Sequence, residues 1–94
     1  MDYKDTRWKR KRRAILRRDG YQCQIARRYG KARVADTVHH IFPVEDHPEW
    51  WLCDWNLISV SRAAHNKLHL PDGELSAEGI ALRERTARKR GIEL

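Results

Sequence analysis

The spacing of the histidines constrains this 94-residue chain more than any other feature. His39 and His40 are adjacent, and His65 and His69 lie four residues apart. Side chains four apart on a helix share one face, so His65 and His69 can approach a single cation. Adjacent side chains on an extended strand point in opposite directions, so His39 and His40 should diverge. The pattern predicts a metal site with one histidine of the adjacent pair, the other being free to take a proton.

The charge of the chain is high and unevenly distributed. The formal net charge is +7; residues 1–33 contain thirteen lysines and arginines against three acidic residues, whereas residues 34–75 contain two against seven. A strongly basic N-terminal segment next to a metal centre is expected to contact phosphates. A solvated basic helix is the alternative. We take double-stranded DNA as the expected partner, with candidate contacts at Lys9, Arg10, Lys11, Arg12, Arg13, Arg17, Arg18, Arg27, Arg28 and Lys67.

Length and cysteine content point to one small cytoplasmic domain. Ninety-four residues support a single domain with a small core. Cys23 and Cys53 do not form the pattern of a secreted disulfide scaffold. No apolar run reaches the length of a signal sequence or a membrane span, so no membrane contact is expected.

The first third of the chain predicts one amphipathic helix followed by irregular structure. Residues 6–18 should form a basic helix, capped by Asp5 or Thr6 and ended at Asp19-Gly20. Its narrow apolar stripe is expected to consist of Trp8, Ala14, Ile15 and the stem of Lys11. Residues 21–25 should be extended, and residues 27–33 should form a turn.

The remainder predicts two short strands and two helices, which makes the fold class α+β. Strands are expected at 36–41 and 57–60, joined by an irregular loop, and a helix should follow from about 62 to 70. A final helix should run from 76 to 90 and bury Ile80, Leu82 and Ala87.

This central arrangement resembles the HNH endonuclease family, most closely its small phage and prophage members. The matching segments are Val38-His39-His40-Ile41 with Pro43, then Asn56-Leu57, then His65-Asn66-Lys67-Leu68-His69, with a similar lead-in from Ala14 to Cys23. The resemblance covers about residues 7–70. It implies a single nuclease domain over residues 1–94, with a ββα-metal (His-Me finger) core at 36–70 between the basic helix and the C-terminal helix.

The chain departs from the family at a second, structural zinc site. Many HNH proteins carry two C-x-x-C pairs, and here the corresponding positions hold Cys23 and Ala26, then Ser61 and Ala64. One thiolate cannot form a four-cysteine zinc site. We therefore expect small side chains to pack where relatives bind zinc, and no structural zinc.

The resemblance also implies a role for each residue of the site. His40 would be the general base, and His39 and His65 would hold one divalent ion (Mg, Mn, Ni or Zn), with His69 as a third ligand or a phosphate contact. Asn56 would act without touching substrate, by tying the loop between the strands and so orienting His40. The expected activity is DNA hydrolysis that leaves a 5′ phosphate and a 3′ hydroxyl.

The biological setting follows from the resemblance alone. It implies phage genome processing or packaging in the cytoplasm of a bacterial host, with a terminase or another packaging protein as partner. A monomer would nick one strand, and a homodimer would break both. The alternatives are a non-catalytic DNA-binding packaging accessory that keeps the fold, and a colicin-type toxin nuclease.

Overall fold

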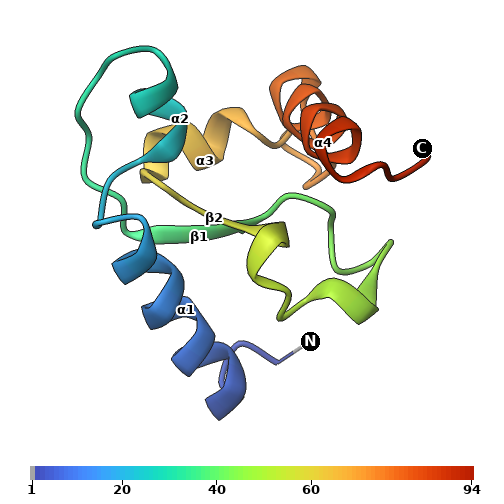
Figure 1. The fold of residues 1–94 in the computed structure, drawn as a ribbon, viewed down its shortest axis with the longest axis horizontal. Helices are drawn as coiled ribbons and strands as arrows, with labels where there is room; N and C mark the ends of the chain where they lie inside the picture. The colour runs from blue at the N-terminus through green and yellow to red at the C-terminus, as the bar shows by residue number, and fades with distance from the viewer. Residues whose placement is uncertain (1) are drawn as a thin grey trace.

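A two-stranded antiparallel sheet lies at the centre of the molecule, with the N-terminal helix on one side and three further helices on the other (Figure 1). The computed structural model describes residues 2–94. Strand β1 (Thr37–His40) pairs with β2 (Leu57–Val60), so that Thr37 lies opposite Val60 and His40 lies opposite Leu57. Both strands were expected from the sequence, and β1 is one residue shorter at each end than predicted.

Helix α1 (Thr6–Arg18) covers one face of this sheet and has the bounds predicted from the sequence. The Asp5 carboxylate caps it by accepting a hydrogen bond from the Arg7 amide. Its buried residues pack with Ala35, Val38 and Leu57; they are Trp8, Ile15 and Leu16. The prediction of Ala14 in this stripe was wrong. Ala14 lies about 240° around the helix from Trp8, which points it to solvent.

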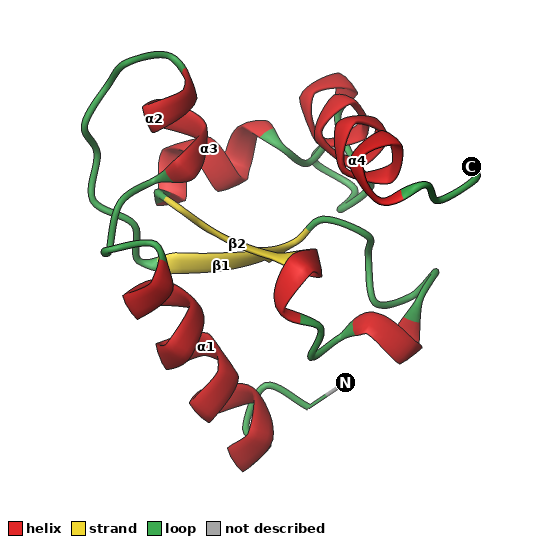
Figure 2. Cartoon of the chain, viewed as in Figure 1, coloured by secondary structure: helices red, strands yellow, loops and turns green. Residues whose placement is uncertain are grey.

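The other face of the sheet is covered by α2 (Gln24–Arg28), α3 (Arg62–Lys67) and α4 (Ala77–Arg90) (Figure 2). The core on this side contains Phe42, Val60, Leu68 and Leu82, among others. The predicted extended segment and turn at 21–33 were wrong in part, because a short helix occupies 24–28. The Cys23 sulfur caps this helix by accepting a hydrogen bond from the Ala26 amide. Cysteine is not a preferred capping residue, so the sequence gives little indication that a helix begins here.

The four positions of the family's zinc site lie in this second core. Cys23 is fully buried, Ala26 and Ala64 pack against the same cluster, and Ser61 caps α3 by accepting from the Ala64 amide. Small side chains therefore pack at these positions, as expected from the sequence.

Helix α4 begins against the end of α3, and this junction fixes the segment that carries His69. The Ser76 amide and hydroxyl donate to the carbonyls of Leu68 and Lys67. Gly79 lies so close to the Leu68 carbonyl that any Cβ at this position would overlap it. Leu82 and Ala87 are buried as predicted, but Ile80 is 37% exposed, because Gly79 takes the position nearest the core.

The connection between the strands, predicted as irregular, contains two short 3-10 helices at Pro48–Trp50 and Asp54–Asn56. Trp50 and Trp55 pack edge-on against each other and against Phe42. Across residues 2–94, no helix has both the length and the apolar character needed to cross a membrane.

Candidate metal centre and catalytic site

Three of the four predicted site histidines meet at one point beside β1. His39 comes from β1 and His65 from α3. The prediction of a helix to about residue 70 was wrong: α3 ends at Lys67, because Ser76 bonds the carbonyls of Lys67 and Leu68, so His69 lies just beyond the helix. One ring nitrogen from each lies within 4.8 Å of the other two. The ring centroids are 4.6 to 5.4 Å apart. The three predicted ligands are thus close enough to contact one ion.

The chemistry of these three rings fits a divalent cation. His39 is 2% exposed, and its Nε2 is buried without a hydrogen-bond partner among the described residues. A buried polar atom left in this state is unfavourable unless a ligand satisfies it. His69 Nδ1 lies 3.3 Å from the His65 carbonyl, so Nδ1 carries the proton and Nε2 keeps its lone pair for a metal.

Two histidines of this cluster, His39 and His65, have lowered pKa values. Burial, and then the neighbouring His65 and His69, lower the pKa of His39 from 6.5 to about 3. Burial and then His69 also lower the pKa of His65. Imidazole binds metals in its neutral form, so these shifts keep the lone pairs available at neutral pH.

His40 points to the opposite face of the sheet, where α1 packs. Its Nε2 lies 3.0 Å from the Trp51 carbonyl, and its ring stacks on Trp8 at a centroid distance of 4.9 Å and an interplanar angle of 22°. Because a carbonyl only accepts, Nε2 must donate, which leaves the lone pair on Nδ1. Burial lowers the pKa of His40, and the bond to Trp51 partly offsets this. His40 is therefore a neutral base with a fixed tautomer.

Asn56 is fully buried and fastens the loop that follows His40. Its Oδ1 accepts from the Phe42 amide at 2.7 Å, and its Nδ2 donates to the carbonyls of Phe42 and Trp50 at 3.1 and 3.3 Å. The Asn56 carbonyl also accepts from the Ile41 amide. One side chain thus joins the end of β1 to the segment that presents the Trp51 carbonyl to His40.

An open hollow of about 730 Å³ connects the two histidine environments. All four β1 residues line it, which places the hollow along β1, whose other edge pairs with β2. Tyr3, which packs edge-on against Trp8, borders it near α1, and residues around α3 border it elsewhere. His39, His40, His65 and His69 all face this one hollow.

No protein-family model matches the chain, and no curated protein matches it. A solved structure does match: the HNH endonuclease of the deep-sea thermophilic bacteriophage GVE2, crystallised with a manganese ion. The match has a TM-score of 0.67 and 28% sequence identity, and covers 97% of this chain and 82% of that one. This likeness in fold and sequence supports the assignment of the chain to the HNH endonuclease family. The shared fold and the histidine cluster support a nuclease-type function with metal binding.

The predicted DNA contacts fall into distinct groups in the structure. On α1, four side chains are exposed and form no hydrogen bond or ion pair within residues 2–94: Lys9, Arg10, Arg13 and Arg17. Lys11 instead pairs with the Asp54 carboxylate at 2.5 Å, and Arg12 donates to the Asp36 carbonyl. Arg27 and Arg28 end α2, and Lys67 ends α3. Arg28 and Lys67 border a separate groove, away from the histidines.

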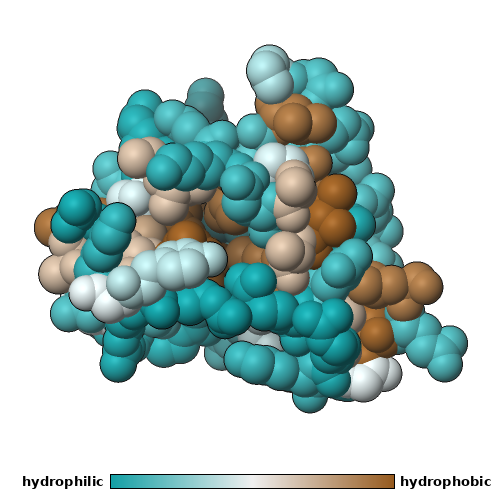
Figure 3. All heavy atoms as spheres, turned by 90° about the horizontal axis from the view of Figure 1, so that it is seen from above, coloured by the Kyte–Doolittle hydropathy of each residue, from teal (hydrophilic) through white to brown (hydrophobic). Residues whose placement is uncertain are grey.

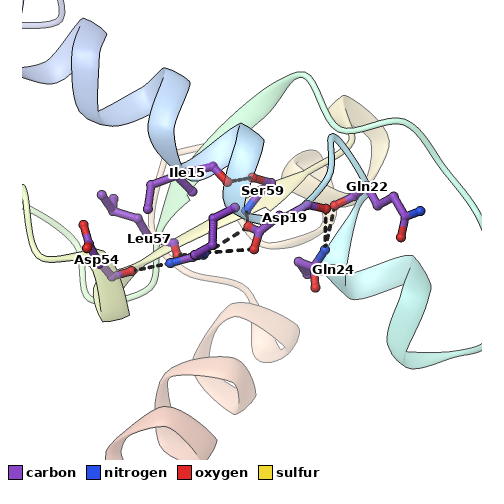
Figure 4. Close-up of polar contacts among 8 residues, drawn as sticks. Ile15, Asp19, Gln22, Gln24, Asp54, Leu57 and Ser59 are labelled. Atoms are coloured by element: carbon purple, nitrogen blue, oxygen red, sulfur yellow. Dashed lines mark hydrogen bonds and ion pairs between the residues drawn. The ribbon is translucent and has the colours of Figure 1, made fainter.

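Arg18 has a structural position at the junction of α1 and β2, and Figure 4 labels its partners Asp19, Asp54 and Leu57. Its guanidinium donates to the carbonyls of Asp54 and Leu57 and pairs with the Asp19 carboxylate. Asp19 also accepts from the Ser59 amide. Burial raises the pKa of Asp19, but the bonds from Arg18 and Ser59 outweigh it, and the net pKa is lowered. These bonds compete with any contact of Arg18 to DNA.

The sequence did not single out two residues that hold His40. Trp8 was expected to be only a packing anchor, and the role of Trp51 rests on its backbone carbonyl. The position of Trp8 in the apolar stripe of α1 could have indicated that its ring contacts the sheet. A backbone acceptor leaves no signal in the residue type.

Proposed function

We propose that this HNH protein is a divalent-metal-dependent endonuclease that hydrolyses DNA phosphodiester bonds, acting as a single nuclease domain. One observation carries the proposal: three clustered imidazoles and a fourth with a fixed tautomer line the same open hollow from opposite faces of β1. This arrangement matches the needs of in-line displacement, in which the attacking water and the leaving oxygen lie on opposite sides of phosphorus.

His40 is the proposed general base. With Nε2–H donated to the Trp51 carbonyl, Nδ1 can accept the proton of the attacking water. The Trp8 ring, stacked on the imidazole, restrains its orientation and favours the cationic form that proton transfer produces. His40 is then an oriented base rather than a mobile surface residue.

His39, His65 and His69 are the proposed ligands of the ion. A divalent ion supplies charge neutralisation at the phosphate and at the departing 3′ oxygen when bound there. Asn56 is the proposed positioning residue for His40. Its side chain bonds the Phe42 backbone, which follows β1, and the Trp50 carbonyl, which precedes the residue that accepts from His40. Because the 3′ oxygen is the leaving group in this reaction, the products carry a 5′ phosphate and a 3′ hydroxyl.

The exposed cations of α1 are the proposed DNA contacts nearest the site. α1 packs on the sheet through Trp8, which touches His40, so its free basic side chains lie on the same side of the molecule as the proposed base. They can hold the phosphate backbone without reading bases, which predicts weak sequence preference. One site cuts one strand, so a monomer would nick and a homodimer would break both strands.

We also propose a role in phage genome processing or packaging in a bacterial cytoplasm, with a terminase or another packaging protein as partner. The support is the likeness to a bacteriophage HNH endonuclease. A non-catalytic DNA-binding accessory with the same fold is the competing function. The intact histidine set and the orphaned His39 Nε2 favour the enzyme.

The test is cleavage of supercoiled plasmid by the purified protein with Mg²⁺, Mn²⁺, Ni²⁺ or Zn²⁺, and with EDTA. The proposal predicts nicked circles with at least one of these ions and none with EDTA. His47→Ala serves as the control, because His47 pairs with Glu49 outside the cluster and should leave cleavage unchanged. Binding without cleavage in every metal would support the accessory instead.

A further inference from the structure

A second concave surface lies between α2, α3 and α4. This groove has a volume of about 480 Å³. Its basic residues are Arg28, Lys31, Arg33, Lys67 and Arg85, and Glu78 is the one acidic residue among those that line it. Its apolar lining comes from Ile25, Ala26, Ala63, Ala64, Leu68 and Ala81. Figure 3, which views the molecule from this side, shows apolar surface set among hydrophilic side chains.

The five cations around this groove outnumber its single carboxylate, that of Glu78. Within residues 2–94, none of the five forms an ion pair, and the one hydrogen bond among them joins Arg33 to the carbonyl of its own neighbour, Ala32. Arg7, Lys11 and Arg18, in contrast, are each paired with a carboxylate. Five like charges around one hollow repel one another, and an anionic occupant would relieve this repulsion.

The groove is separate from the metal centre. Ala63, Ala64 and Lys67 face the groove from α3, while His65 lies roughly 150° around the same helix and faces the histidine cluster. The helix therefore stands between the two surfaces. A DNA segment seated at His40 and the metal ligands would not reach into the groove without passing around α3.

We propose that this groove binds an acidic segment of a partner protein, with apolar side chains of that segment seated on the groove floor. The basic rim complements aspartate and glutamate, and the alanine-rich floor leaves room for larger apolar side chains. The inference goes beyond the proposed nuclease activity and does not depend on it.

The shape and lining favour a peptide over nucleic acid. A duplex presents a convex, wholly polar backbone, which cannot use an apolar floor. A single strand would need aromatic platforms for its bases, and Tyr29 is the one aromatic residue that lines the groove. Aliphatic and alanine side chains instead accept leucine-like or phenylalanine-like anchors.

The experiment is selection of peptides from a displayed random library of about 12 residues on the wild-type chain, followed by affinity measurements on variants. Enriched peptides should combine net negative charge with large apolar residues. Ala63→Trp fills the groove without changing charge, and Arg85→Glu reverses one rim charge; each should weaken binding by at least about tenfold. Lys4→Glu, the same charge change at an exposed residue outside the groove, should alter it less than about twofold.

Circular dichroism of each variant separates lost binding from lost folding, and Arg85→Glu serves if Ala63→Trp does not fold. A library that yields no acidic and apolar class overturns the proposal, as do peptides whose binding survives both groove variants. The same variants are tested with a 20-base-pair duplex. Loss of duplex affinity without any effect on peptides would make the groove a nucleic-acid surface. Because no readout here is cleavage, failure of this proposal is distinct from failure of the nuclease proposal.

Discussion

The two faces of the two-stranded sheet place the adjacent residues His39 and His40 in different chemical environments. On the α3 face, His39 is 2% exposed, its Nε2 has no hydrogen-bond partner within residues 2–94, and two more imidazoles lie beside it. On the α1 face, His40 is half-buried, bonded to a carbonyl and stacked on an indole. The alternation of side chains along a strand is enough to separate the proposed metal ligand from the proposed base, and the helices on each side then set the environment of each.

The largest effect expected from this comparison is on cleavage. His40→Ala removes the proposed base while leaving the three ligands in place, so plasmid nicking should fall by about 10²- to 10⁴-fold in saturating metal. Binding to a short duplex should change little, because the basic residues of α1 are untouched. Equal losses in cleavage and in duplex binding would show that His40 is structural, and the division between the faces would fail.

Asn56→Ala should disturb both faces at once. It leaves the Phe42 amide and carbonyl without their buried partner, so the free energy of unfolding should fall by about 2–4 kcal/mol in chemical denaturation. Asn66→Ala is the matched control, because Asn66 is exposed, and should cost less than about 0.5 kcal/mol. A loss at Asn56 no larger than at Asn66 would contradict its role as the tie between the strands.

Gly79→Ala should affect the metal face alone. The added Cβ overlaps the Leu68 carbonyl, which lies between His65 and His69, so α4 must shift. We expect stability to fall by about 1–3 kcal/mol, although alanine normally stabilises a helix relative to glycine by about 1 kcal/mol. Mn²⁺ affinity should fall with it. Ser59→Ala is the control: it removes a hydrogen bond to the Ile15 carbonyl on the α1 face and should leave Mn²⁺ affinity unchanged. A rise in the stability of Gly79→Ala would contradict the close contact between Gly79 and the Leu68 carbonyl.

Acid should weaken the metal-free protein through His39. Its folded pKa of about 3 lies below the ordinary value of 6.5, so between these pH values the unfolded chain binds more protons. Stability is therefore complete above pH 6.5 and falls as pH decreases. Between pH 7 and 5, with EDTA, the loss from His39 should be about 2 kcal/mol. His39→Gln cannot titrate there and should show a smaller slope; an equal slope would assign the effect to other groups.

Much of this arrangement could be predicted from residue pattern, and the failures have physical causes. The strands, the cap at Asp5 and the meeting of His39, His65 and His69 could be predicted from spacing and local chemistry, although α3 ends at Lys67 and His69 lies beyond it. Helix α2 was missed because its cap is a cysteine sulfur and it is five residues long.

Other features depend on contacts between distant parts of the chain. Ile80 is exposed because Gly79 meets Leu68, and Leu16 replaces Ala14 in the α1 core because the sheet meets the helix on that side. The hold on His40 by the Trp51 carbonyl is a backbone contact, which residue identity cannot reveal.

Titration calorimetry with Mn²⁺ on His39→Ala and His40→Ala tests the division between the two faces most directly. We predict that His39→Ala weakens Mn²⁺ binding by at least about 100-fold, since it removes the innermost ligand. His40→Ala should bind within about threefold of the wild type, since its ring lies on the other face. Equal weakening in both variants, or wild-type affinity in His39→Ala, would contradict the account.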